Sequence, residues 1–335
     1  SERYKLKRKY LQIIHSIFSI QLGKLNLLHL RAAFASKKLF QKYKFHKQDL
    51  VIFPSADYYG VKAFLKQLAK MKVAERPRVH LRFIGVLELR QSIFFNSLIE
   101  LITLINANFY TITVSTEVPI YADYLNTLLP HHSVIAEPYP VLEIPTLSKY
   151  TTTEKKEDFF TIVLPGSNRL DKGYFELYHL AKEILYPFPK IHVLAQDMKE
   201  WDKKFNKAYQ FKLSQLPNVT LLDAILSKDT IQTLYEKADL ILLPYHSSVY
   251  HYRGSAIHYE AILHGVPVLA QRGSGFIGEI ESWSSGWTYE TKQELFSCLE
   301  QIMSMDQKSL QKKMQQAMLN YWRSINETNR ILNLP

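Results

Sequence analysis

The sequence predicts an α/β protein with two domains, each built on a parallel sheet. Apolar runs of strand length alternate with segments of helical periodicity in both halves of the 335-residue chain, and such alternation favours parallel pairing of the strands. Single hydrophobic cores stop growing beyond about 250–300 residues, so the length also favours two domains. In the second half, polar turns that contain glycine lie next to two of the apolar runs.

The amino-terminal half supplies the elements of the first domain. Its strands are short apolar runs, and the helices between them have apolar residues at helical spacing. We expect strands at residues 49–54, 78–84, 109–115 and 133–137, and helices at residues 61–72, 94–105 and 118–128. A polar, threonine-rich stretch follows and predicts the linker between the domains.

The carboxy-terminal half repeats this alternation. We expect strands at residues 160–164, 218–223, 239–245 and 266–270, with helices beginning near residues 174, 227 and 255. Helical spacing resumes after Glu294 and predicts further helices at the end of the chain. The predicted organisation is a basic amphipathic helical segment (1–48), a first α/β domain (49–145), a linker (146–158), a second α/β domain (159–305) and carboxy-terminal helices (306–335).

Two glycine turns of the second domain suit a phosphate-bearing ligand. In the first, Gly166 follows a strand, and Arg169 and Lys172 supply positive charge before the next helix. In the second, Gly254 and Ser255 open a helix whose free N–H groups can bind an anion.

One carboxylate lies within the helix of the second turn. Glu260 is about a turn and a half from the start of that helix. Its apolar neighbours, residues 261–263, predict burial, and an unpaired buried carboxylate is costly. A hydroxyl-rich ligand would satisfy it.

The order of these motifs resembles the donor-binding domain of GT-B glycosyltransferases, in particular the large retaining family of bacterial nucleotide-sugar glycosyltransferases. The similarity extends from Phe159 to Trp287. Four pieces carry it: Gly166 with Lys172-Gly173, residues 218–223, residues 235–244, and Glu260-Ala261 followed by residues 265–268. The resemblance implies a GT-B fold, in which two Rossmann-like domains with parallel sheets face a central cleft. It also implies that residues 49–145 form the acceptor-side domain, that residues 159–305 form the donor-side domain, and that the last helix crosses back onto the first domain.

The resemblance also implies roles for individual residues. Arg169 and Lys172 would neutralise the donor diphosphate, and Glu260 would bind the ribose. The remaining donor-binding positions would be Gly166, Tyr252, Arg253, Gly254, Ser255 and Ala256. No cofactor and no protein-bound metal is expected, because this fold uses the nucleotide-diphosphate sugar as a substrate and generally needs no bound metal.

One position departs from the family pattern. The family has a Glu near the transferred sugar, eight residues before the ribose-binding Glu, and Tyr252 stands there in this chain. Tyr cannot supply the same fixed negative charge. Residues 250–255 resemble a variant in which Tyr and Arg precede Gly-Ser, so we interpret the chain as a subclass that lacks the first Glu of the Glu-x7-Glu motif. The family implies a retaining hexosyltransferase, and the departure leaves the stereochemical outcome open.

The sequence does not assign a catalytic residue. Working residues of the first domain should lie in loops after strands, where Asp57, Glu88 and Glu117 are the carboxylates. On position alone, each is a candidate general base. A solvated loop carboxylate or a helix cap is the alternative for each of them.

The first 47 residues account for the whole formal charge of +11. They hold twelve Lys or Arg and one acid, whereas the rest of the chain holds 30 basic and 30 acidic residues. Apolar residues at helical spacing among these cations favour an anionic membrane surface. Helices that pack on the first domain and turn their lysines to water are the alternative. Nucleic acid is not an expected partner, because no recognised nucleic-acid motif accompanies the charge.

Other features bound the compartment and the ligands. A single cysteine, the absence of a signal-peptide pattern and the absence of a long apolar run predict a cytoplasmic protein. If the basic amino-terminal segment binds lipid, the protein is peripheral on the inner face of the cytoplasmic membrane. Residues 273–278 fit a dinucleotide fingerprint, but they follow the fourth expected strand of their domain, so bound NAD is not expected. His246, His251, His258 and His264 lack the spacing of metal ligands.

The resemblance implies a glycosyltransferase that moves a sugar from a nucleotide-diphosphate donor to a glycan, lipid-linked or other acceptor. Cell-surface polysaccharide or glycoconjugate synthesis is the expected setting. A non-catalytic GT-B partner subunit is one alternative, because Tyr252 replaces a family acid. A nucleotide-sugar epimerase is another, because it uses the same architecture.

Overall fold

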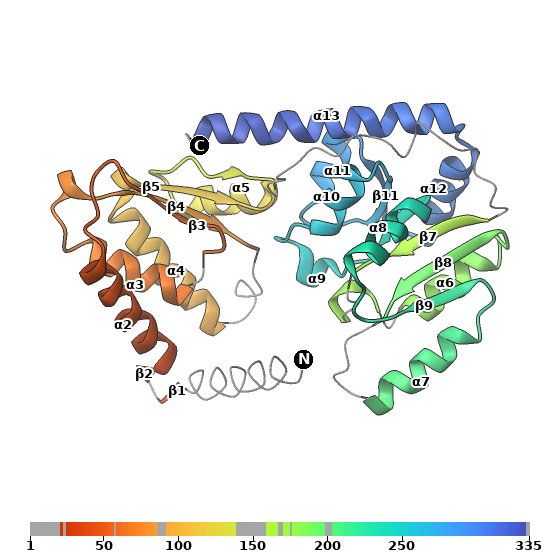
Figure 1. Cartoon of the computed structure of the whole chain (residues 1–335), viewed down its shortest axis with the longest axis horizontal. Coiled ribbons are helices and arrows are strands. Elements are labelled where there is room, and N and C mark those ends of the chain that lie inside the picture. The colour runs from red at the N-terminus through yellow and green to blue at the C-terminus, as the bar shows by residue number, and fades with distance from the viewer. Residues whose placement is uncertain are drawn as a thin grey trace. The chain divides into compact units, whose positions relative to one another are not determined.

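The computed structural model describes residues 21–22, 25–56, 58–85, 92–138, 159–166, 170–174, 176–197 and 203–332 (Figure 1). The described residues form two compact units. The first contains those up to Thr116 together with Ala122–Ile135, and the second contains Glu117–Tyr121 and those from Ala136 onward. The predictions for residues 1–20 and for the linker at 146–158 lie outside the described residues.

The first unit contains a four-stranded sheet. Its strands, in spatial order, are β3 (Leu50–Phe53), β4 (Arg78–Phe83), β5 (Ile112–Thr116) and β6 (Ile135–Ala136). β4 pairs in parallel with both β3 and β5, as the alternating sequence predicts. Strand β5 begins three residues later than expected, because Phe109–Thr111 forms a 3₁₀ turn.

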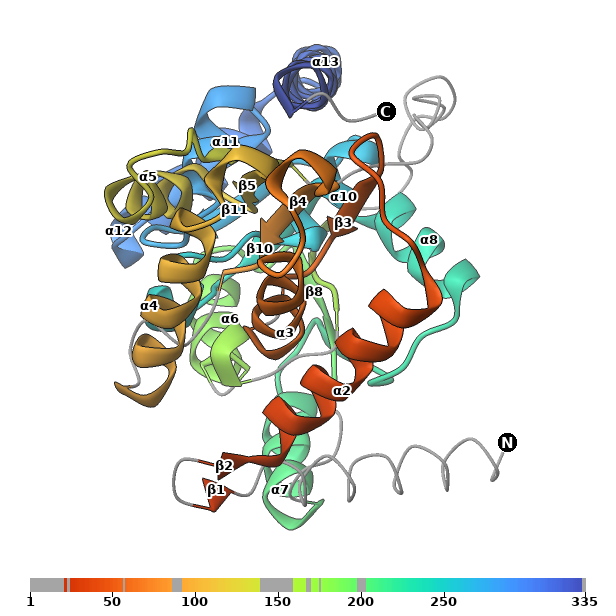
Figure 2. The same cartoon turned by 90° about the vertical axis from the view of Figure 1, so that its left-hand side faces the viewer.

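Helices α2 (Leu27–Lys42), α3 (Tyr58–Leu68), α4 (Ser92–Asn106) and α5 (Pro119–Leu128) accompany this sheet, and β1 (Gln21–Leu22) pairs with β2 (Leu25–Asn26) in a short antiparallel ribbon. Figure 2 shows α2 beside α3. The contact between them is aromatic, because Phe40 and Phe45 lie with their ring centroids 5.1 and 5.9 Å from that of Phe64. On α3, Val61, Leu65 and Leu68 are fully buried.

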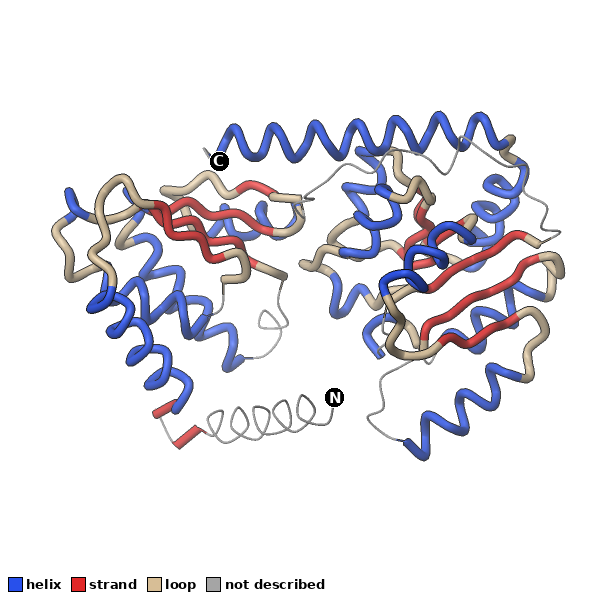
Figure 3. Tube along the Cα trace, in the orientation of Figure 1, coloured by secondary structure: helices blue, strands red, loops and turns tan. Residues whose placement is uncertain are grey.

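The second unit contains a six-stranded parallel sheet (Figure 3). Every neighbouring pair is parallel. In spatial order the strands are β12 (Gly286–Tyr289), β11 (Val268–Gln271), β10 (Leu240–Leu243), β7 (Phe160–Leu164), β8 (Ile191–Gln196) and β9 (Val219–Leu222). The chain therefore starts in the middle, builds outward to β9, and returns to β10 to build the other way. This is the doubly wound order, and it creates a switch point between β7 and β10.

Eight helices accompany the strands of this unit within the described ranges: α6 (Leu177–Leu185), α7 (Lys203–Ser214), α8 (Lys228–Lys237), α9 (Ser247–Tyr250), α10 (Ala256–Leu263), α11 (Ile277–Trp283), α12 (Lys292–Ser304) and α13 (Gln307–Leu332). Side chains at three N-caps define where helices begin. Ser227, Ser255 and Thr291 each accept the backbone N–H three residues further on, at the starts of α8, α10 and α12.

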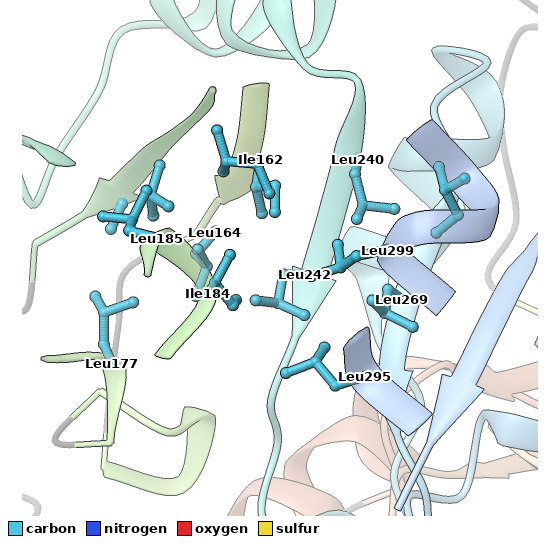
Figure 4. Packing of buried hydrophobic residues seen from close by; sticks show 14 of the residues in the cluster. Ile162, Leu164, Leu177, Ile184, Leu185, Leu240, Leu242, Leu269, Leu295 and Leu299 are labelled. Carbon is cyan, nitrogen blue, oxygen red and sulfur yellow. The ribbon is translucent and has the colours of Figure 1, made fainter. Parts of the chain in front are cut away.

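The core of the second unit lies between the sheet and helices α6 and α12 (Figure 4). Ile162, Leu242 and Leu269 come from three adjacent strands, and Leu177 and Leu299 come from the two helices. All five are at most 2% exposed. Burying one such side chain stabilises a fold by about 1.5–3 kcal/mol, so this layer fixes the strands whose carboxyl ends carry the glycine turns.

A second cluster joins α10 and α11 to the long helix α13. It contains Tyr259, Ile262, Trp283, Met318, Tyr321 and Ile325. Helix α13 is therefore fastened to the second unit, and its expected crossing onto the amino-terminal domain stays a prediction. Across the described ranges, no helix is long and apolar enough to cross a membrane.

Sequence reasoning missed five elements of the second unit. They are β8, α7, α9, α11 and β12. With β8 present, the strand before residues 273–278 is the fifth of its sheet and not the fourth. Polar His192 interrupts the apolar pattern of β8, and β12 spans only Gly286–Tyr289, so neither gives a clear strand signal.

Candidate functional site

The switch point of the second sheet brings two loops together. Gly166 follows β7, and Tyr245 and His246 follow β10, its parallel neighbour. In open α/β sheets, ligands bind outside the carboxyl ends of strands at such a point. The fold therefore directs attention to the two glycine turns that the sequence singled out.

Gly166 lies where the two turns meet. Its φ of +83° is in the left-handed region, and a Cβ at this position would lie 2.6 Å from Cδ1 of Ile257 in helix α10. The first turn and the start of α10 are therefore in direct contact, as the predicted joint site requires. Residues 167–169 lie outside the described part of the chain, so the role of Arg169 stays a prediction.

Lys172 lies beside this glycine. Its Nζ is 3.2 Å from the position that a Gly166 Cβ would take and 5.3 Å from the centroid of the Tyr245 ring. The next residue, Gly173, has φ of +76°, and a Cβ there would lie 2.5 Å from the carbonyl oxygen of Pro244. This close approach presses the turn against the end of β10 and holds the lysine at the switch point.

Arg253 brings a second cation to the first turn. Its Nη1 lies 3.9 Å from the Asp171 carboxylate, and both side chains are about one fifth exposed. The carbonyl oxygen of Asp171 also accepts the backbone N–H of His246 at 3.1 Å. These contacts tie the first turn to the loop after β10, so two cations, Lys172 and Arg253, accompany the meeting of the two turns.

The start of α10 differs in one respect from the sequence expectation. Ser255 is buried and caps the helix, as its position predicts, and Ala256 is exposed. The N–H of Gly254 is not free, however, because it donates to Oε2 of Glu117 at 3.2 Å. A Cβ at Gly254 would lie 3.3 Å from Cβ of Glu117, so this approach favours glycine. A carboxylate thus already occupies one of the N–H groups predicted to bind an anion.

Glu260 is exposed, and the expectation that it is buried was wrong. Ala261 and Ile262 are fully buried, but the side chain of Glu260 lies on the other side of α10. One of its oxygens, Oε2, accepts the hydroxyl of Tyr235 at 2.8 Å. The Tyr235 ring is stacked on His264, with centroids 4.6 Å apart and planes 6° from parallel. The carboxylate is therefore held by a buried phenol and open to a ligand.

Tyr252, the position of the missing family acid, is in an aromatic environment. It is partly buried, and its ring centroid lies 5.3 Å from that of Tyr121 and 4.5 Å from that of His251. The planes of these rings are inclined to that of Tyr252 by 43° and 72°, so Tyr252 packs among aromatic rings in tilted and edge-to-face contacts.

A buried polar cluster lies beneath the second turn. His258 is fully buried, and its Nε2 is 2.7 Å from Oγ of Ser285. Burial lowers the pKa of His258 to about 3, so the ring is neutral. Its neighbour Tyr259 donates its hydroxyl to Glu279, which is 3% exposed, at 3.0 Å. The sequence did not identify Glu279, which gives no signal beyond lying after the glycine loop at residues 273–278.

That glycine loop packs on the turn after β10. Gly273 has φ of +90°, and a Cβ there would lie 2.7 Å from Cβ of Ser247. The N–H of Gly275 donates to the carbonyl oxygen of Tyr250 at 2.7 Å. These contacts agree with the interpretation of residues 273–278 as a glycine loop that borders this site. Within the described ranges, no three His, Cys, Asp or Glu side chains are placed to hold a metal ion.

The three candidate bases have different outcomes. Glu117 is described, partly buried, and grouped with the second unit, where it contacts Gly254. Asp57 and Glu88 lie outside the described residues. Their candidacy stays a prediction.

Comparison with solved structures shows the class of fold. The chain has the GT-B fold, as its motifs predict. It is similar to an α,α-trehalose-6-phosphate synthase from Burkholderia multivorans, with a TM-score of 0.66 and 8% identity over 89% of this chain and 71% of that chain. It is also similar to a UDP-forming α,α-trehalose-phosphate synthase from Burkholderia xenovorans in complex with glucose-6-phosphate, with a TM-score of 0.64 and 12% identity over 92% and 77%.

A third solved structure is described as trehalose-6-phosphate from E. coli bound with UDP-2-fluoro glucose. Its TM-score is 0.65, with 12% identity over 91% of this chain and 76% of that chain. No protein-family model matches the sequence, and no curated protein matches it. At these identities the similarity establishes the fold.

Proposed function

We propose that the protein is a glycosyltransferase that uses a nucleoside-diphosphate sugar as its donor. The observation that carries this proposal is the meeting of the two glycine turns at the switch point of the second sheet, with Lys172 and Arg253 beside them and Glu260 open on α10. Solved structures of the same fold support it, because one is a UDP-forming synthase and another is bound with UDP-2-fluoro glucose.

The arrangement suits departure of a diphosphate. Negative charge builds on the diphosphate as the bond to the sugar breaks, and fixed cations and helix-start amides stabilise it. Lys172, Arg253 and the first N–H groups of α10 supply these groups, with Arg169 as a further cation of the first turn. Glu260 would accept hydrogen bonds from the ribose. Catalysis by these groups needs no metal ion.

The proposed function also includes the class of acceptor and the location of the enzyme in the cell. We favour a glycan or lipid-linked acceptor in cell-surface polysaccharide or glycoconjugate synthesis, with the enzyme on the cytoplasmic side of an anionic membrane. Helix α2 supports this, because residues 27–47 hold six Lys or Arg and no acid. On the same helix, Leu30 is 52% and Phe34 62% exposed, and Nζ of Lys38 lies 4.7 Å from the Phe34 ring centroid. Cations flanking exposed apolar side chains are suited to an anionic lipid surface.

Thermal unfolding with a panel of nucleotides tests the donor site. A ligand that prefers the native state raises the melting temperature by mass action. We expect one of UDP, GDP or ADP, or its sugar conjugate, to raise it, and Lys172→Ala to abolish the rise. Lys237→Ala is the matched control, because Lys237 is an exposed lysine at the end of α8 in the same unit. No rise with any nucleotide would contradict the proposal.

A non-catalytic GT-B partner subunit is the second candidate function. Tyr252 favours it, because an aromatic side chain stands where the family has an acid. Sugar transfer by the purified chain alone, with a donor and an acceptor extract, separates the two. Transfer supports the enzyme, and nucleotide binding without transfer supports the partner subunit.

A further inference from the structure

Tyr235 and His264 both contact Glu260 and also contact each other. The Tyr235 hydroxyl donates to Oε2 of Glu260 at 2.8 Å, and the Tyr235 ring is stacked on His264. His264 in turn caps α10 and donates its backbone N–H to the carbonyl oxygen of Glu260 at 3.0 Å. The carboxylate of Glu260 thus contacts Tyr235, and its carbonyl group contacts the backbone of His264, whose ring is stacked on that of Tyr235.

Tyr235 is held more firmly than the carboxylate that it contacts. It is 1% exposed on α8, whereas Glu260 is exposed on α10. Burial raises the pKa of Tyr235 well above that of a free phenol, and the neighbouring Glu260 raises it further. The hydroxyl therefore remains a donor at any working pH, and an ionised carboxylate can only accept.

This geometry leaves a defined part of the carboxylate for a ligand. One lone pair of Oε2 is used by Tyr235, so Oε1 and the remaining lone pair of Oε2 face other donors. Two adjacent hydroxyl groups, such as the 2′ and 3′ hydroxyls of a ribose, match two carboxylate oxygens. A carboxylate whose orientation is fixed before binding does not lose that freedom when the ligand arrives.

We propose that Tyr235 is a positioning residue that orients the Glu260 carboxylate toward the two ribose hydroxyls of the donor, and so sets the preference for ribonucleotides over 2′-deoxyribonucleotides. The inference rests on the proposed function, since it needs a nucleoside diphosphate at this site. It adds a residue from a different helix, α8, to the recognition of the ribose.

The test is a comparison of two ligands on four proteins. Isothermal titration gives the dissociation constants of UDP, or of whichever nucleoside diphosphate stabilises the protein, and of its 2′-deoxy counterpart. The proteins are the wild type, Tyr235→Phe, Glu260→Gln and the control Tyr209→Phe. Tyr209 suits the control because its hydroxyl accepts the backbone N–H of Tyr178 in the same unit, so the same atom is removed elsewhere.

We expect the wild type to prefer the ribonucleotide about tenfold, the value of one hydrogen bond to a charged group. Tyr235→Phe should reduce the preference to about twofold, mainly by weakening the ribonucleotide, and Tyr209→Phe should leave it unchanged. Glu260→Gln should also lose most of it. The ratio of the two constants is informative because a packing defect would weaken both ligands equally.

Three results overturn the inference. If Tyr235→Phe keeps the wild-type preference, or weakens both ligands by the same factor, the tyrosine only supports the fold. If the wild type binds both ligands equally and Lys172→Ala abolishes binding, the donor site is supported, but the proposed role of Tyr235 is wrong. If the wild type binds no nucleoside diphosphate, both the proposed function and this inference are wrong.

Discussion

The two parallel sheets use their polar residues in different ways. In the second sheet, Gly166 and Gly173 have positive φ and press the first turn against its neighbours, and Lys172 lies between them with its charge at the switch point. In the first sheet, the polar groups contact one another. His80 on β4 lies 2.9 Å from Oγ1 of Thr113 and 3.2 Å from Oγ of Ser115 on β5. A turn that binds phosphate must expose its backbone, whereas a sheet can satisfy its own polar side chains internally.

Replacing Gly173 should test this difference most strongly. A Cβ at Gly173 meets the carbonyl oxygen of Pro244 at 2.5 Å, and the φ of +76° disfavours any other residue. We expect Gly173→Ala to lower the free energy of unfolding by about 3 kcal/mol, measured by denaturant titration. Gly278→Ala is the control, because nothing lies within 4 Å of its Cβ position inside α11, and it should change stability by less than about 1 kcal/mol. Equal effects would show that the turn tolerates a side chain.

Substitution of Glu117 tests whether its carboxylate replaces the family acid that is absent at Tyr252. Its Oε2 accepts the N–H of Gly254, two residues after Tyr252. Glu117→Gln keeps an acceptor oxygen and removes the charge. We expect kcat to fall about 100-fold, with the dissociation constant of the nucleoside diphosphate changed less than about threefold. Tighter binding of the diphosphate by the variant would show instead that Glu117 competes with the donor for this N–H.

His258 gives the second unit a predicted pH dependence. Burial lowers its pKa to about 3, while the unfolded chain takes up the same proton near the ordinary value of about 6.5. The unfolded state therefore binds more protons between these values, and stability falls as the pH falls, by about 1.4 kcal/mol per pH unit. Chemical denaturation between pH 6 and pH 4 should show this slope, and His258→Asn should remove that share of it.

Two neighbours bear on that measurement. Glu279 has Oε2 4.0 Å from Nδ1 of His258, and the Tyr259 hydroxyl donates to the same carboxylate. If the wild type and His258→Asn have equal slopes, His258 is protonated in the folded state and paired with Glu279. His179→Asn, on the exposed face of α6, is the control for loss of an imidazole.

The smallest effect is expected in the first sheet. Ser115→Ala removes one neighbour of the buried His80 ring and should lower the free energy of unfolding by about 1 kcal/mol. Binding of the nucleoside diphosphate should not change, because these groups serve one another. A loss of binding in calorimetry would contradict the contrast between the two sheets.

The sequence predicted the fold and the two glycine turns more fully than the side-chain contacts. Gly166, Lys172 and Gly173 could be recognised because glycine and charge at fixed spacing after an apolar run have a direct physical meaning. The contact of Tyr235 with Glu260 could not, because the two residues are 25 positions apart and lie on different helices. Glu279 was missed for a related reason, since its partner Tyr259 is separated from it by a strand and a loop.

The apolar pattern was also misleading at one point. Ala261 and Ile262 are buried, and this suggested that Glu260 is buried with them. Consecutive residues on a helix point about 100° apart, so two buried neighbours leave room for an exposed one. The exposure of Glu260 follows from the orientation of α10, which depends on its packing against α11 and α13. The order of apolar and polar residues along the chain does not predict how the helix is oriented against its neighbours.

The strand order of the second sheet has a mechanical consequence. Gly166 and Lys172 belong to the half made of β7, β8 and β9, whereas Arg253 and Glu260 belong to the half made of β10, β11 and β12. The two halves meet along the single seam between β7 and β10. A ligand that contacts both turns would therefore hold the two halves of the sheet together. Cutting the chain between β9 and α8 would turn the unit into two fragments, and the proposed nucleotide ligand would then strengthen their reassembly, which is the working principle of a split-protein sensor.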